Sequence, residues 1–157
     1  MAQPTKEHLQ SAQRALKYAS GTKDRGLLYR IGVAEQLVGY KDADWARNVG
    51  DRRSTSRFAF SLGSAAIVWS SRKQLTVALS STEAEYRGAA VATCEAIWLK
   101  RLLKDLQMAV SDPMTIYCDN LSNIQLVKKS VFHARTKHIE VHYHFVCERV
   151  LSGEVEL

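Results

Sequence analysis

The chain lacks the features that hold small extracellular proteins together or anchor proteins in a membrane. It has three cysteines in 157 residues, and Cys94, Cys118 and Cys147 are odd in number and not spaced like zinc ligands. This excludes a disulfide framework and favours a reducing, intracellular compartment, the cytoplasm or the nucleus. No apolar run approaches the roughly 20 residues that span a bilayer, and no signal peptide opens the chain, so we expect no membrane partner.

Internal repeats and low-complexity segments are also absent, and the composition is that of a globular domain. The length of 157 residues, with 46% hydrophobic and 24% charged residues, fits one domain with a real core. Acidic charge is in the minority, since the net charge is +6 and the isoelectric point is near 9.3. This balance favours a polyanionic partner.

Hydrophobic periodicity predicts the order of the secondary structure. Apolar residues at helical spacing predict helices over 4–20, 81–106, 121–128 and 136–151. Short β-prone runs predict strands over 26–31, 37–42, 57–62, 65–70, 114–118 and 154–157. The three strands over 37–42, 57–62 and 65–70 form a meander, and the later strands alternate with helices. This order predicts an α/β (mixed α+β) fold with antiparallel and parallel pairing in one sheet.

Acidic residues gather at the ends of three of these predicted elements. Two motifs, Tyr-Lys-Asp-Ala-Asp-Trp over 40–45 and Ile-Tyr-Cys-Asp-Asn over 116–120, end β-prone runs. A third, Ser-Ser-Thr-Glu-Ala-Glu-Tyr over 80–86, opens the long helix. Carboxylates that converge repel one another unless a cation lies between them, so the pattern suggests a magnesium site for phosphodiester chemistry. Spacing alone supports equally well a set of unrelated surface acids.

Two of the motifs leave a choice of carboxylate. Asp42 and Asp44 share strand parity, so periodicity does not separate them. Glu83 and Glu85 lie about 200° apart around a helix, so only one of them faces a common site. A capping box from Ser80 to Glu83 would occupy Glu83 and leave Glu85 for the site, although Thr82 and Glu85 form a competing box. Asp119, in the motif over 116–120, has no such rival.

Together these motifs resemble the ribonuclease H domain of copia-type (pseudovirus) retrotransposon polyproteins. The resemblance covers about 37–157, and residues 4–31 resemble the end of the reverse-transcriptase connection just upstream. It therefore implies two parts, 1–35 and 36–157. The matching runs are Asp-Ala-Asp-Trp over 42–45, Asp-Arg-Arg-Ser-Thr-Ser over 51–56, Ala-Leu-Ser-Ser-Thr-Glu-Ala-Glu-Tyr over 78–86, Cys-Glu-Ala-Ile-Trp-Leu over 94–99, Ile-Tyr-Cys-Asp-Asn over 116–120 and Arg-Thr-Lys-His-Ile-Glu over 135–140.

The resemblance implies a fold, an activity and a set of site residues. The fold is a five-stranded mixed sheet with flanking helices, and the activity is endonucleolytic cleavage of the RNA strand of RNA–DNA hybrids. Asp42, Glu85 and Asp119 become the catalytic, metal-binding carboxylates for two Mg²⁺ or Mn²⁺ ions. One ion would activate water and the other would stabilise the leaving 3′-oxygen. Specificity would come from groove shape and 2′-hydroxyl contacts.

Contacts to phosphate are expected at three places around such a site. The residues are Arg52, Arg53, Ser54 and Thr55 in one connection, Ser80, Ser81 and Thr82 at the helix start, and Asn120. A solvated loop explains the arginine pair equally well. The family has glycine at the positions of Arg47 and Arg57, so we expect either an altered hairpin or a more basic path for the hybrid.

The end of the chain departs from the family in a second way. There the last strand continues past a pair like Glu156-Leu157 into a helix whose Leu-Ala-Asp motif supplies a fourth carboxylate. This sequence stops earlier, so we expect weak activity and self-association through an open sheet edge. The alternative is a non-catalytic remnant that binds nucleic acid or protein.

Four histidines and one further acid lie near the same end. His133, His138, His142 and His144 favour a polar helix face, although the spacing of His138 and His142 could chelate zinc. Glu140 lies among them and is a candidate substitute for the fourth acid.

Overall fold

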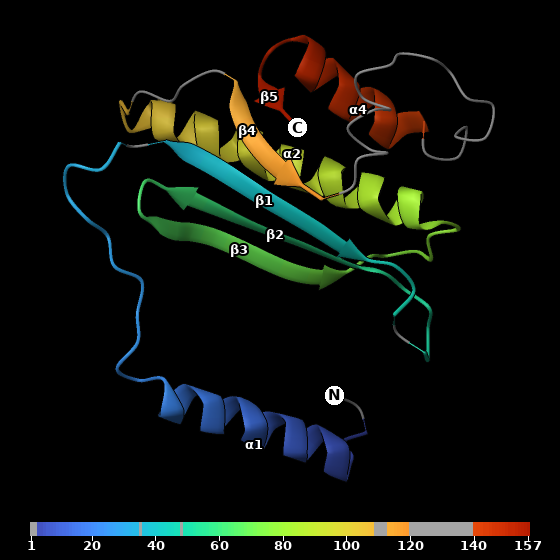
Figure 1. The fold of residues 1–157 in the computed structure, drawn as a ribbon. Helices are drawn as coiled ribbons and strands as arrows, with labels where there is room; N and C mark the ends of the chain where they lie inside the picture. The colour runs from blue at the N-terminus through green and yellow to red at the C-terminus, as the bar shows by residue number, and fades with distance from the viewer. Residues whose placement is uncertain (1–2, 35, 48, 109–112, 120–139) are drawn as a thin grey trace.

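The computed structural model describes residues 3–34, 36–47, 49–108, 113–119 and 140–157 (Figure 1). The elements in chain order are α1 (Lys6–Gly21), β1 (Leu37–Asp44), β2 (Thr55–Leu62), β3 (Ala65–Lys73), α2 (Ser81–Asp105), β4 (Met114–Cys118), α4 (Glu140–Leu151) and β5 (Val155–Glu156). The helix predicted over 121–128 and the first residues of the one predicted over 136–151 lie outside the described residues. None of the described helices is long and apolar enough to cross a bilayer.

The five strands form one mixed sheet, which confirms the predicted fold class. Their order is β3-β2-β1-β4-β5. The β1–β2 and β2–β3 pairs are antiparallel, whereas β1–β4 and β4–β5 are parallel. The predicted turn between β2 and β3 is present, and Gly63 takes a φ of +59° there, which suits a residue without Cβ. The parallel β1–β4 pair brings the carboxyl ends of both strands to one edge of the sheet.

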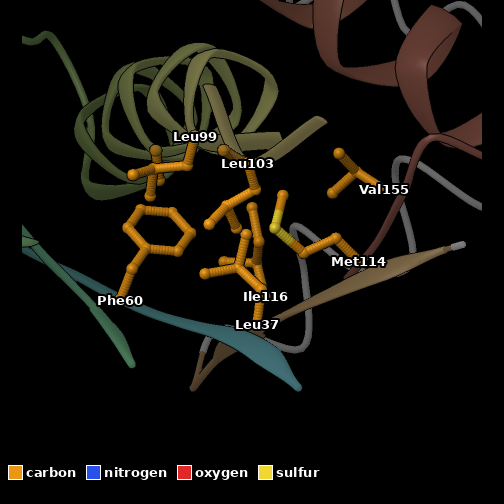
Figure 2. Close-up of a cluster of buried hydrophobic side chains, with 9 residues drawn as sticks. Leu37, Phe60, Leu99, Leu103, Met114, Ile116 and Val155 are labelled. Atoms are coloured by element: carbon orange, nitrogen blue, oxygen red, sulfur yellow. The ribbon is translucent and has the colours of Figure 1, made fainter. Parts of the chain in front are cut away.

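Helix α2 covers one face of the sheet and completes the main core. Ala84, Ala92 and Ala96 are fully buried on α2, and their small side chains let the helix lie close to the strands. The C-terminal half of α2 meets the start of β1 and β4 in an apolar cluster (Figure 2). Its buried members are Leu37, Phe60, Ala92, Ala96, Leu99, Leu103, Met114, Ile116 and Val155.

Helix α4 packs against α2 in a second cluster (Figure 1). The buried members are Tyr86, Ala89, Ala90, Val146 and Cys147. The two clusters fix α2 along its length, so the position of its N-terminal end relative to the strands is set by apolar packing.

The N-terminal segment differs from expectation in one element. The strand predicted over 26–31 is wrong, because these residues form no ladder and are exposed. They cross the end of the β2–β3 hairpin, where the Tyr29 hydroxyl donates to the Ala66 carbonyl at 2.7 Å and the Arg30 N–H donates to the Ser64 hydroxyl at 2.9 Å. These residues therefore contact the hairpin through single hydrogen bonds and do not add a strand to the sheet beside β3.

The predicted first helix is confirmed as α1, which begins after a capping box at Thr5. The Thr5 hydroxyl accepts from the His8 N–H at 3.3 Å, and the Thr5 N–H donates to His8 Nδ1 at 3.1 Å. None of the α1 residues is buried, and Figure 1 shows the helix apart from the sheet. The division of the chain at residue 35 stays a prediction.

Candidate metal centre

Three carboxylates from three elements meet at the edge of the sheet. Asp42 lies near the end of β1, Asp119 directly follows β4, and Glu85 lies in the first turns of α2. Lys41 pairs with Cys118 in the parallel register, which brings the next residues of the two strands, Asp42 and Asp119, side by side. Carboxylate oxygens of Asp42, Glu85 and Asp119 all lie within 4.8 Å of one another. We call these three residues the acidic cluster.

Helix capping explains why Glu85 and not Glu83 joins the acidic cluster. The Ser80 hydroxyl accepts from the Glu83 N–H at 3.1 Å, as predicted for the N-cap. The Glu83 carboxylate returns to the N–H of Leu79 at 2.7 Å, one residue earlier than expected, and also accepts from Arg87. Glu83 is therefore held at the helix start, and the rotation of about 200° directs Glu85 to the sheet edge.

The number of arginine partners distinguishes Asp44 from Asp42, which strand parity could not do. Asp44 accepts hydrogen bonds from Arg47 at 3.1 Å and from Arg57. The hydrogen bond from Arg47, followed by that from Arg57, holds the pKa of Asp44 below its ordinary value of 3.8. Arg57 also donates to Asp42 at 2.9 Å. Arg47 and Arg57, which stand where the family has glycine, thus place their guanidinium groups beside these carboxylates.

The expected distortion of the hairpin at Arg57 does not occur. Arg57 keeps regular register with Asp42 on β1 and Ser71 on β3. Its backbone is extended, so the position needs no glycine here. The other expectation, a more basic surface near the site, agrees with the placement of both arginines.

Lys41 is a site residue that the sequence reasoning missed. Its side chain is completely buried, and its ammonium group donates to a carboxylate oxygen of Glu85. The signal was the alternation along β1, where Lys41 shares inward parity with Leu37, Gly39 and Ala43. A lysine on the buried face of a strand needs a partner, and the adjacent acidic motifs offered one.

The acidic cluster fits a small divalent cation. Mg²⁺ prefers oxygen ligands at roughly 2.0–2.1 Å, so opposite ligands of one ion lie about 4 Å apart. Oxygens that all lie within 4.8 Å reach this spacing after a small contraction. Among the described residues, no other group of acids, histidines or cysteines has such geometry.

The predicted phosphate contacts from 52 to 55 divide into exposed and buried residues. Arg52 and Arg53 are exposed, and the Arg53 N–H donates to Asp51 at 3.1 Å. Ser54 is fully buried, and its hydroxyl accepts from the Ala46 N–H at 3.2 Å. The expectation for Ser54 is therefore corrected, because its hydroxyl supports the connection from within. Thr55 is half-buried at the start of β2.

The remaining predicted positions lie at the helix start and beyond the described residues. Ser81 is exposed, and Ser80 and Thr82 are half-buried. Asn120, His133 and His138 lie outside the described residues, and so does the side chain of Glu140 at the start of α4. The two described histidines of α4, His142 and His144, are exposed.

A basic groove lies between β3 and α2. It has a volume of about 710 Å³. Its polar lining includes Arg72 and Lys73 from β3 and Arg87 and Glu95 from α2, and Trp69 adds an exposed aromatic ring.

Known proteins support both the fold and the ancestry of the chain. It is 43% identical over 157 residues to the "Retrovirus-related Pol polyprotein from transposon RE1" of Arabidopsis thaliana, covering 100% of this chain and 11% of that protein. It is also 43% identical over 147 residues to the corresponding polyprotein from transposon TNT 1-94 of Nicotiana tabacum, covering 94% and 11%. No protein-family model matches the chain.

A solved structure gives the fold independently of sequence. Ribonuclease H1 from the halophilic archaeon Halobacterium salinarum superimposes with a TM-score of 0.52 at 11% identity, covering 75% of this chain and 78% of that chain. The fold is therefore ribonuclease H-like, with an acidic cluster at the sheet edge. The chain belongs to the retrovirus-related Pol polyproteins of copia-type retrotransposons, in which it forms a domain of ribonuclease H-like fold, and it spans about a tenth of the length of these relatives.

Proposed function

We propose that the chain is a metal-dependent endonuclease that cleaves the RNA strand of RNA–DNA hybrids. The observation that supports this most directly is the acidic cluster, in which Asp42, Glu85 and Asp119 bring oxygens within 4.8 Å of one another. Carboxylates this close repel one another, so a cation bound between them would be stabilised. Asp119 is exposed and Asp42 half-buried, so the cluster reaches the surface of the protein.

Each cluster residue has a stated role in this proposal. Asp42 and Asp119 offer ligands from neighbouring strands, and Glu85 closes the site from α2. When bound, Mg²⁺ or Mn²⁺ supplies an activated water and stabilises the leaving oxygen. The chain's own part is to fix these ligands, and the core beneath α2 keeps Glu85 in place.

The polyanionic substrate is supported by the distribution of basic side chains. Arg52 and Arg53 are exposed on the connection after β1, and Ser81 is exposed at the start of α2. Helix N-termini and arginines are common phosphate contacts, and they carry no base specificity. The shape of the A-like hybrid and its 2′-hydroxyls would then select RNA–DNA over double-stranded DNA.

Cleavage of labelled substrates tests the proposal. The natural chain should cut the RNA strand of a hybrid in MgCl₂ or MnCl₂, and should leave the matching double-stranded DNA intact. Asp119→Asn should reduce the rate at least a hundredfold, or about 2.7 kcal/mol of barrier. Loss of a mere hydrogen-bond partner behind a metal ligand already costs roughly 10- to 100-fold.

Asp105→Asn is the matched control, because Asp105 is an exposed aspartate at the end of α2, away from the acidic cluster. It should cleave at the natural rate. Equal rates for the natural chain and Asp119→Asn would contradict the proposal, as would cleavage that persists in excess chelator.

A second candidate function is binding of the hybrid without cleavage. Lys41 and Arg57 already pair with Glu85 and Asp42, so the carboxylates are partly neutralised by the protein itself. A binding remnant would show salt-dependent affinity for the hybrid and no metal-dependent cleavage. The same assay, with a binding titration at two salt concentrations, separates the two candidates.

A further inference from the structure

We propose that the Lys41 ammonium takes the place of one of the two cations expected at the acidic cluster, so that the cluster binds a single divalent ion. This inference rests on the proposed function, because it concerns the metal content of the same site. It assigns Lys41 the role of a positioning residue, acting through Glu85.

The first observation is the burial and the partner of Lys41. Its side chain is 0% exposed, and its Nζ is bonded to a carboxylate oxygen of Glu85, whose side chain is 9% exposed. Lys41 approaches from the inward face of β1, the face that α2 covers. Movement away from Glu85 would leave a buried ammonium without its partner, which is strongly unfavourable. We therefore treat its charge as a fixed part of the site.

The second observation is the balance of charge. Three carboxylates carry −3, and Lys41 reduces this to −2. One divalent ion then brings the set to zero, whereas two would leave +2 in a partly buried place before substrate binds. Without Lys41 the same three carboxylates with two divalent ions would carry +1. Lys41 thus makes the second ion unfavourable, since charges a few ångströms apart interact strongly near a protein surface.

Arg57 differs from Lys41 and does not play the same part. Its side chain is 41% exposed, and its guanidinium is shared between Asp42 and Asp44. An exposed, shared arginine can leave Asp42 when an ion binds, at little cost. The Lys41 ammonium is paired with Glu85, and its side chain has no exposed surface, so the two cations of the site are expected to behave differently.

Counting bound Mn²⁺ tests this inference without measuring cleavage. The full chain, without nucleic acid, is titrated with MnCl₂, and free Mn²⁺ is followed by electron paramagnetic resonance. The natural chain should bind one ion at saturation. Lys41→Met, which keeps the length of the side chain and removes its charge, should bind two ions. Arg57→Gln should change the affinity less than threefold.

Two further variants keep the test decisive. Lys41→Gln also removes the charge but retains a hydrogen-bond donor for Glu85. It takes the place of Lys41→Met in the test if Lys41→Met does not fold, and it should bind Mn²⁺ with the result expected for Lys41→Met. Lys73→Met removes an exposed lysine that pairs with Asp51 at 2.9 Å, away from the acidic cluster. It should bind Mn²⁺ as the natural chain does, which separates a local effect from a change in net charge.

The outcomes distinguish the single-ion inference from the proposed metal site on which it rests. Two ions in the natural chain, or a single ion in both the natural chain and the Lys41 variants, would overturn the inference and leave the proposed function intact. An equal gain in Lys73→Met would also overturn it. Failure of all the variants and of the natural chain to bind Mn²⁺ would overturn the proposed metal site itself.

Discussion

The two ends of the same three elements, β1, β4 and α2, are built on opposite principles. At one end, Leu37, Ile116 and Leu103 join the apolar cluster in Figure 2. At the other end the elements place Asp42, Glu85 and Asp119 within 4.8 Å of one another. Burial of apolar surface stabilises the first end, at about 25 cal/mol per Å². Repulsion between carboxylates destabilises the second unless a cation is present.

The difference shows how the positions of the three carboxylates can be well defined although their repulsion is energetically unfavourable. The strands and the helix are continuous through both ends, so the apolar end fixes the register that the acidic end needs. One-residue shifts of β1 against β4 would separate Asp42 from Asp119 and would also remove Leu37 and Ile116 from the core. The geometry of the acidic cluster is therefore maintained by apolar residues far from it.

Truncation of Phe60 should have the largest effect on this arrangement. Phe60 is 0% exposed and belongs to the apolar cluster. Phe60→Ala should lower the free energy of unfolding by about 3–5 kcal/mol, because the lost burial is added to a cavity. Urea unfolding measures the change. Trp69→Ala is the control, since Trp69 is 67% exposed and should cost much less. Equal losses for both variants would contradict the position assigned to the core.

Overfilling the same end should cost less. A Cβ on Gly39 would lie 2.5 Å from Phe60 Cε1 and 3.2 Å from Ile116 Cγ1. Gly39→Ala should therefore destabilise the chain by about 1–3 kcal/mol in the same unfolding experiment. Gly26→Ala is the matched control, because nothing lies within 4 Å of its added Cβ. If Gly39→Ala proves as stable as the control, the close approach of β1 to Phe60 is wrong.

Charge removal at the acidic end should change stability little and metal dependence greatly. Asp119 is exposed, so Asp119→Asn should alter the free energy of unfolding by no more than about 0.5 kcal/mol without metal. The natural chain should gain thermal stability in MgCl₂, because a ligand of the folded state raises the melting temperature. Asp119→Asn should lose this gain. A variant that melts higher in MgCl₂, as the natural chain does, would contradict the role of Asp119.

The sequence predicted the regular parts of the molecule and the members of the cluster for different reasons. Periodicity was sufficient for 81–106 and for the β2–β3 hairpin, because local pattern and burial agree there. It failed for 26–31, where an apolar run lies exposed at the β2–β3 hairpin and does not pair with the edge strand β3. The three carboxylates that lie together are Asp42, Glu85 and Asp119. The resemblance had pointed to this set, whereas spacing alone left the choice between Asp42 and Asp44 open. The side-chain partners of Lys41 and Arg57 depend on cross-strand and helix–sheet contacts, which no local pattern encodes.

The smallest expected effect is a pH dependence at the border of the acidic end. Hydrogen bonds from Arg47 and then Arg57 hold the pKa of Asp44 below 3.8. A carboxyl group whose pKa is lower in the folded chain stabilises folding above its unfolded pKa, and this contribution is lost as the pH falls through the folded pKa. The natural chain should therefore be more stable than Asp44→Asn at pH 6, and the difference should shrink below about pH 4. Because the Asp44 side chain is 26% exposed and lies beside exposed arginines, we expect a difference of less than about 1 kcal/mol. Urea unfolding of both chains from pH 6 to pH 2.5 measures it, with Asp105→Asn as a control for a carboxylate at the other end of α2. A difference that grows as the pH falls would mean that Asp44 is protonated more readily in the folded chain, against the geometry of its two arginine partners.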